Sequence, residues 1–172
     1  MKHQALSSIR PEQPTDAAAI THLVRAAFAP LAYSSHTEQL IIAALRRSGQ
    51  LTVSLVALEG DELAGYVAVS PVSVSSGATG WYGIGPLAVA PARQHCGIGT
   101  QLMQAVLATL RQQHANGCVL LGDPAYYKRF GFKPEATLVL PDVPHAYFQA
   151  LSFTGKVPTG IVRFHAAFEA TA

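Results

Sequence analysis

The chain has 172 residues, of which 49% are hydrophobic and only 13% are charged. Its length predicts one domain, residues 1–172, with a core of its own, and a charged share well below the usual value of about 25% excludes a disordered chain. The formal net charge is +2, and lysines and arginines form no run. This composition excludes a polybasic nucleic-acid surface, and no apolar run reaches the roughly 20 residues of a membrane-spanning helix.

The opening part of the chain predicts a strand followed by a helix. The first residues lack the apolar stretch of a signal peptide, so we expect a protein of the cytoplasm. Residues 7–10 are expected to form a short strand, which Pro11 ends. Thr15 is a suitable N-cap for the helix, because apolar side chains recur at helical spacing from there to Phe28.

A second helix and a hairpin are predicted next. Ser35 and Glu38 have the spacing of a capping box, and Gly49 fits the C-terminal stop of the same helix. Residues 51–74 contain two β-branched, apolar runs around the turn residues 59–62, which predicts a β-hairpin.

The second half of the chain alternates strands and helices. From Ile98 the apolar residues change from strand spacing to helical spacing, and Asn116-Gly117 is expected to end that helix. The predicted elements, in the order strand, helix, strand, helix, strand and strand, are residues 81–90, 98–116, 118–121, 123–130, 147–153 and 160–168. Together with the hairpin, this order predicts an α+β (mixed α/β) domain.

The stretch PLAVAPARQHCGIGTQLM, residues 86–103, places a glycine loop between a strand and a helix. A helix begins with unpaired N–H groups and a partial positive charge, so such a loop can bind phosphate through main-chain amides and needs no lysine. The chain contains no P-loop motif. Gly83–Ala88 matches the dinucleotide-binding pattern G-x-G-x-x-A, but it lies within a strand-like run that contains Pro86 and precedes no helix. A nucleotide-dependent oxidoreductase is therefore the weaker alternative.

Two motifs together indicate a family. Gln94–Gly99 reads Q-x-x-G-x-G at the strand-to-helix junction, and Tyr127–Phe132 reads Y-x-x-x-G-F one predicted strand later. In order and spacing they resemble the GCN5-related N-acetyltransferase (GNAT) superfamily. The longer phrases IGPLAVAP and LLGDPAYYKRFGF are similar to its YhbS-like subgroup, and the resemblance covers nearly the whole chain.

This resemblance implies a fold and a cofactor, acetyl-CoA. The fold is a twisted, mostly antiparallel mixed sheet that is splayed between its fourth and fifth strands and flanked by helices. The main chain of the fourth strand, at Leu87, Ala88 and Val89, is expected to bind the pantetheine arm and the acetyl carbonyl. The residues whose amides are expected to bind the pyrophosphate are Gln94, His95, Cys96, Gly97, Ile98, Gly99 and Thr100.

The resemblance also implies that Tyr127 is the catalytic acid. An amine that attacks the thioester expels CoA as a thiolate, and a phenol with a pKa near 10 can protonate that sulfur. Lys128 and Arg129 are expected to be solvated helix charges. The general base stays open, because residues 81–89 contain no carboxylate. Glu38, His36 and Asp123 are candidates, although Asp123 also fits the N-cap of the helix that carries Tyr127.

The implied function is direct transfer of an acetyl group from acetyl-CoA to an amine acceptor, a small molecule or a protein. A non-catalytic acyl-CoA-binding module is the alternative. An acyl-cysteine route through Cys96 is disfavoured, because a thiolate beside a phosphate is repelled. No metal is expected, since His95 and Cys96 match no zinc spacing. Neither nucleic acid nor a membrane is an expected partner, and a homodimer stays open.

Overall fold

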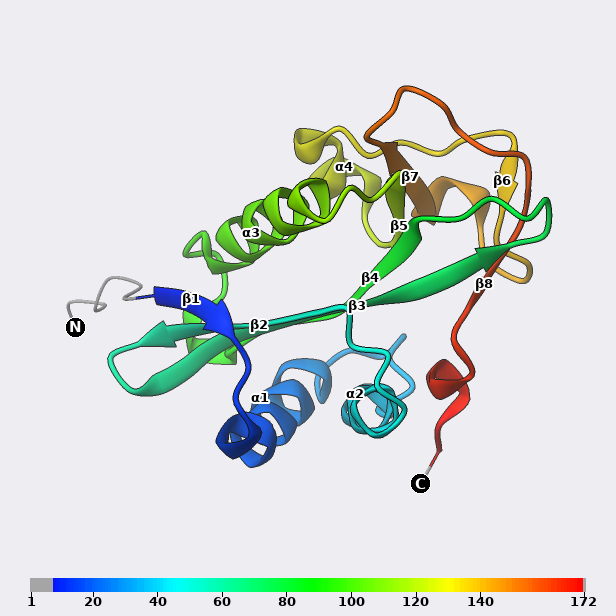
Figure 1. Cartoon of the computed structure of the whole chain (residues 1–172). Helices are drawn as coiled ribbons and strands as arrows, with labels where there is room; N and C mark the ends of the chain where they lie inside the picture. Colours follow the sequence, from blue (N-terminus) through cyan, green and yellow to red (C-terminus); the bar gives the residue numbers. More distant parts are fainter. Residues whose placement is uncertain (1–7, 172) are drawn as a thin grey trace. The chain divides into compact units, whose positions relative to one another are not determined.

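The computed structural model describes residues 8–171, so Ser7 of the predicted opening strand lies outside the described residues. The chain forms two compact units, each assembled from segments that are distant in sequence (Figure 1). The first unit contains the chain up to Val69, Pro86–Leu107 and the C-terminal residues from Ala166, and the second contains Ser70–Gly85 and Ala108–His165. Three elements run from one unit into the other: strands β3 (Glu62–Val74) and β4 (Trp81–Val89) and helix α3 (Ile98–Gln112).

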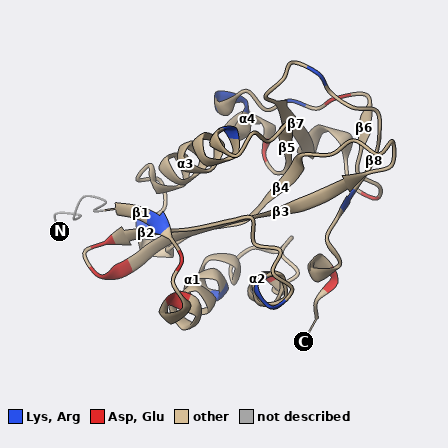
Figure 2. Cartoon of the chain, in the orientation of Figure 1, with Lys and Arg blue, Asp and Glu red and all other residues tan. Residues whose placement is uncertain are grey.

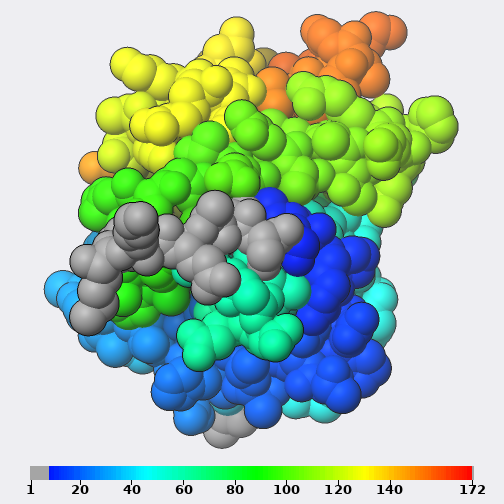
Figure 3. Space-filling model, turned by 90° about the vertical axis from the view of Figure 1, so that its left-hand side faces the viewer, coloured from blue at the N-terminus to red at the C-terminus, as the bar shows by residue number. Residues whose placement is uncertain are grey.

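The strands of the first unit are antiparallel. β1 (Ser8–Pro11) pairs with β2 (Val53–Glu59), which pairs with β3. The hairpin turn lies between the paired residues Glu59 and Glu62, as predicted. In Figure 3 the blue surface of β1 adjoins the teal surface of this hairpin.

Helices α1 (Ala17–Phe28) and α2 (Glu38–Arg47) pack against one face of these strands, below them in Figure 1. Apolar side chains at helical spacing meet alternate residues of the strands, which is the pairing of periods that a helix-on-sheet core requires. The cluster includes Ile20, Val24, Ile42, Val56, Tyr66, Ala68 and Ala88.

The first turns of α3 lie on the opposite face of the same strands. Ile98 and Leu102 are buried, and both approach Gly65 of β3 so closely that a Cβ there would lie 2.9 Å and 2.8 Å from their methyl groups. The start of α3 is therefore seated directly on the strand backbone.

The second unit contains parallel and antiparallel pairs. β5 (Gly117–Leu121) pairs in parallel with β4 and antiparallel with β7 (Phe148–Ser152). β8 (Gly160–Phe164) pairs antiparallel with the end of β3 and in parallel with β6 (Leu138–Val139). The short helix α4 (Pro124–Tyr127) follows β5, and a 3-10 turn, Lys128–Phe130, continues it.

Along the sheet the hydrogen-bonded strands follow the order β1-β2-β3-β4-β5-β7. The α+β prediction is confirmed: the sheet is mixed, mostly antiparallel and open. The pairing of β4 with β5 covers only Trp81–Gly83, although β4 continues to Val89. The register of these two strands thus ends at Gly83 of β4.

Some predicted boundaries were wrong, for local reasons. Thr15 lies inside a 3-10 turn and Asp16 is the N-cap of α1. Ser35 and Glu38 form no capping box, because α2 begins at Glu38 with Thr37 as its N-cap; the Ser34 hydroxyl donates to the Glu38 carboxylate. The predicted last strand stops at Phe164, and Ala166–Glu169 forms a 3-10 turn. The helix expected to reach Asn116 ends at Gln112.

Candidate active site

The loop between β4 and α3 is held by its own polar atoms. Gln94, His95, Cys96 and Gly97 are all exposed. The Gln94 side-chain amide donates to the Val89 carbonyl at 3.3 Å, and the Cys96 thiol lies 3.4 Å from the Gln94 carbonyl. Gly97 has φ +85°, a left-handed conformation that favours glycine, and the space where its side chain would lie is open.

The amides at the start of α3 form a row of donors. The first bond of the helical ladder runs from the Gln101 N–H to the Gly97 carbonyl at 3.0 Å. The N–H groups of residues 97–99 precede this bond, so they have no carbonyl one turn back within the helix. Ile98 is 2% exposed and turns its side chain inward. The loop therefore presents backbone rather than side chains, and the helix dipole makes this backbone attractive to an anion.

The cation closest in sequence to this loop is paired with a carboxylate. Arg93 forms an ion pair with Glu59, and both side chains are largely buried. Glu59 belongs to the acidic turn between β2 and β3, red in Figure 2, which also contains Asp61 and Glu62. The charge of Arg93 is therefore already balanced by a carboxylate.

Leu87, Ala88 and Val89 form the last part of β4. Ala88 is 3% exposed and packs in the cluster with α1 and α2, while Leu87 and Val89 are half-buried. No strand of the described residues pairs with this part of β4 on the side of β5. Its backbone can therefore bind an extended ligand as a neighbouring strand would.

Tyr127 lies in the second unit, at the end of α4, and is half-buried. Its ring meets the Tyr126 ring edge to face at 4.8 Å and the Phe132 ring at 6.2 Å. It also lies directly over Gly122, where a Cβ would be only 2.2 Å from the Tyr127 ring. Sequence reasoning missed Gly122, whose only signal is a glycine immediately before the helix.

The neighbouring cation is engaged locally. The Arg129 guanidinium lies over the Tyr126 ring, 4.3 Å from its centroid, and its Nε donates to the Tyr126 carbonyl at 2.8 Å. Tyr126 and Tyr127 thus have different surroundings, since Tyr126 carries a stacked cation while Tyr127 covers a glycine.

The three candidate bases differ in their bonding. Asp123 is the N-cap of α4, as predicted, and accepts a bond of 2.9 Å from the Ala125 N–H. His36 has φ +59°, and its main-chain N–H donates to the Ser34 hydroxyl. Glu38 accepts from the same hydroxyl through Oε1, while its Oε2 is buried with no partner. Of the two carboxylates among these candidates, Glu38 is therefore the one with a buried, unpaired oxygen.

The two cysteines are free and differ in exposure: Cys96 is exposed and Cys118 is buried. Burial raises the pKa of the Cys118 thiol. Among residues 8–171, no three His, Cys, Asp or Glu side chains gather closely enough to bind a metal ion.

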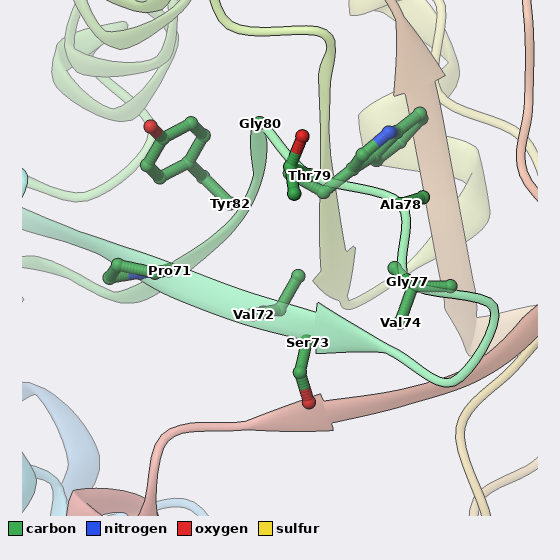
Figure 4. Close-up of a pocket in the computed structure, with 10 residues that line it drawn as sticks. Pro71, Val72, Ser73, Val74, Gly77, Ala78, Thr79, Gly80 and Tyr82 are labelled. Atoms are coloured by element: carbon green, nitrogen blue, oxygen red, sulfur yellow. The ribbon is translucent and has the colours of Figure 1, made fainter.

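A cavity of about 340 Å³ lies in the second unit, between the end of β3 and the start of β4 (Figure 4). Its lining residues are Pro71–Val74 and Gly77–Tyr82. They carry hydroxyl and indole groups but no charge, and in Figure 4 the Ser73 hydroxyl points toward β8. The cavity therefore suits an uncharged group.

The part of the chain that contains the glycine loop and Tyr127 matches a known family. The family model for the acetyltransferase (GNAT) family matches residues 17–132, and the chain belongs to this family. It is an N-acetyltransferase, as the motifs predicted.

Particular relatives are similar over most of their length. The chain is 40% identical over 129 residues, 74% of each protein, to the "Uncharacterized N-acetyltransferase YhbS" of Escherichia coli K12. A solved GNAT family acetyltransferase from Brucella melitensis, in complex with acetyl-CoA, is 48% identical with a TM-score of 0.85. That match covers 96% of this chain and 99% of the other. The structure of Escherichia coli YhbS in complex with CoA is 34% identical with the same TM-score, and covers 100% and 97%.

These comparisons confirm the GNAT fold and the similarity to YhbS. Across residues 8–171, the structure contains no helix of the length and apolarity needed to cross a membrane.

Proposed function

We propose that this N-acetyltransferase binds acetyl-CoA at the loop of residues 94–100 and transfers the acetyl group directly to an amine. The observation that carries this proposal is the row of main-chain donors at residues 97–99, which includes a glycine with positive φ. The acetyl-CoA and CoA complexes of the two similar structures support it. We also propose that residues 1–172 act as one GNAT domain, since the solved relatives align with nearly all of the chain.

In this proposal each part of acetyl-CoA is bound by a different segment. The pyrophosphate accepts bonds from the main chain of residues 94–100, chiefly Gly97, Gly99 and Thr100. The pantetheine arm and the acetyl carbonyl bond to the backbone at Leu87, Ala88 and Val89. An amide near the carbonyl oxygen would stabilise the negative charge that develops there during attack.

The chemical step breaks the thioester. The amine nitrogen forms a bond to the carbonyl carbon, the carbon–sulfur bond breaks, and the sulfur leaves with the electron pair. Tyr127 donates its phenolic proton to that sulfur, a role for which general acid catalysis contributes about 10²- to 10⁴-fold. The amine loses a proton in the same sequence, and the products are the amide and CoA.

Glu38 is the best supported acceptor for that proton. The Oε2 atom of Glu38 is buried and unpaired. Glu38 lies one helical turn before Ile42, and Ile42 packs in the same cluster as Ala88 of β4. A buried carboxylate oxygen without a partner is unfavourable for stability, so a water or an amine at this point would satisfy it. Glu38→Gln should lower kcat at neutral pH, whereas the exposed Glu62→Gln should not.

The acceptor is a small molecule or a protein amine. The reaction needs no metal, because a phenol and a carboxylate can move both protons. We place the protein in the cytoplasm on the ground that its two free thiols suit a reducing compartment.

The test combines binding with turnover. Calorimetry should detect acetyl-CoA binding and no NAD binding, and a thiol-release assay should identify an accepted amine from a panel of small amines and peptide N-termini. Tyr127→Phe should lower kcat by roughly 10²-fold or more while leaving the Kd of acetyl-CoA unchanged. Tyr126→Phe is the matched control and should retain turnover. An unchanged rate in Tyr127→Phe would remove Tyr127 from the acid role, and binding of NAD alone would overturn the proposal.

A further inference from the structure

A buried glutamine in the second unit has no role in the proposed chemistry. Gln149 of β7 is 1% exposed, so its amide lies entirely in the interior. Its Nε2 donates to the Gly122 carbonyl at 3.0 Å. Its Oε1 is buried and has no hydrogen-bond partner. An apolar side chain of the same length at position 149 would avoid the free-energy cost of burying the unpaired Oε1. The contribution of Gln149 is therefore its N–H.

The group that receives this N–H controls the entry into α4. Gly122 is fixed from both sides, because its own N–H donates to the Tyr147 carbonyl at 3.0 Å. Its carbonyl belongs to the same planar peptide unit as the N–H of Asp123, the N-cap of α4. Holding the Gly122 carbonyl therefore fixes the plane from which the cap and the helix start.

The same glycine supports the Tyr127 ring. A Cβ at Gly122 would lie 2.2 Å from Cε2 and 2.8 Å from Cδ2 of this ring, so the ring packs directly on the glycine backbone. The Tyr127 N–H also donates to the Asp123 carbonyl at 3.1 Å. A rotation of the 122–123 peptide would thus move both the surface under the ring and the helix that carries it.

We propose that Gln149 is a positioning residue for catalysis: its buried amide holds the Gly122 carbonyl and thereby fixes the Tyr127 phenol. The inference rests on the proposed acid role of Tyr127. Because general acid catalysis depends on the phenol reaching the sulfur within hydrogen-bond distance, a small rotation of the ring lowers kcat. The glycine loop of the first unit is not involved, so binding of acetyl-CoA does not change.

The test is a double-mutant cycle of Gln149→Met and Tyr127→Phe, with Gln113→Met as the control at an exposed glutamine. Methionine keeps the length and the volume but removes the donor. The rate is thiol release from acetyl-CoA with the best amine of the panel, or with water where no amine is faster. The release is followed as the loss of thioester absorbance, so that no thiol reagent meets the exposed Cys96.

We expect Gln149→Met to lower kcat by about tenfold, since a displacement of 1 Å can lower a rate by up to about 10²-fold. The KM for acetyl-CoA and the melting temperature should stay close to those of the parent. In the Tyr127→Phe background the same substitution should have no further effect, because the group that it positions is gone.

Three results would overturn the inference. A Gln149→Met variant with parental kcat would show that the bond does not position the acid, and the function would stand if Tyr127→Phe is slow. Effects that multiply in the double mutant would show that Gln149 acts independently of Tyr127. If Tyr127→Phe has parental kcat, the acid role fails, and the positioning role fails with it.

Discussion

Gly122→Ala is the sharpest test of the place of Tyr127, because the added atom collides with one group. The new Cβ would lie 2.2 Å from Cε2, 2.8 Å from Cδ2 and 3.3 Å from Cζ of the Tyr127 ring. Gly122 does not have a positive φ, so alanine introduces no backbone strain of its own. The substitution therefore acts through the ring.

The size of the effect follows from these distances. To restore ordinary contact at 3.4 Å, the ring edge must move by about 1.2 Å. Overpacking of this kind lowers the free energy of unfolding by typically about 1–3 kcal/mol. A displacement of about 1 Å in a reacting group can lower kcat by up to about 10²-fold. We expect the Kd of acetyl-CoA to be unchanged.

The assay is urea unfolding together with thiol-release kinetics. In a Tyr127→Ala background the ring is absent, so Gly122→Ala should no longer change the unfolding free energy by more than about 0.5 kcal/mol. The matched control is Gly155→Ala, a turn glycine with φ +81° and open space around it, which should lose stability through backbone strain but retain its kcat. A Gly122→Ala variant that is destabilised through Tyr127 and yet keeps full turnover would refute the reasoning.

Three further predictions concern the loop, the N-terminal ion pair and the thiols. His95 has φ +62° and an exposed side chain, so His95→Val should lower the unfolding free energy by about 1–2 kcal/mol. His95→Gly should keep both the unfolding free energy and the calorimetric Kd of acetyl-CoA. A large loss of affinity in His95→Gly would show that the His95 side chain contacts a phosphate. The pKa of Asp16 is lowered, chiefly by the hydrogen bond from Arg10. The carboxylate therefore stabilises the fold above its unfolded pKa of about 3.9, and this contribution is lost as the pH falls through the lower folded pKa. Urea unfolding of the parent and of Asp16→Asn should show a smaller difference in unfolding free energy at pH 3 than at pH 7. Cys118 is buried and its pKa is raised, so a thiol reagent at pH 7 should modify only the exposed Cys96 rapidly. Cys96→Ser should abolish this fast phase of the modification. A fast reaction of Cys118 would contradict its burial.

Much of the fold could be predicted from the sequence, because the relevant signals are periodic and local. The hairpin turn between Glu59 and Glu62 and the start of α3 at Ile98 fall where composition changes abruptly. The capping residues were harder. Ser34, Ser35 and Thr37 are all suitable N-cap residue types, and the N-cap of α2 is Thr37, after a loop in which His36 adopts a left-handed conformation. Nothing in the residue types distinguishes these three positions.

The conformation of the loop proposed to bind acetyl-CoA could be predicted for a related physical reason. A site made of main-chain amides requires particular backbone angles, and glycine at position 97, with φ +85°, is the residue type that adopts them readily. In the proposed site the side chains would contribute little, and His95 and Cys96 are both exposed.

The surroundings of Tyr127 depend instead on contacts that no local pattern specifies. Gly122 and Gln149 are 27 positions apart, and they meet because Leu120 pairs with Gln149 in the register of β5 and β7. A shift of that register by one residue would turn the glutamine to the other face and bring Phe148 or Ala150 to its place. The sequence motif identifies the tyrosine, but the strand register determines what holds it. Substitutions that disturb this register should therefore reduce turnover even where the motif residues are intact.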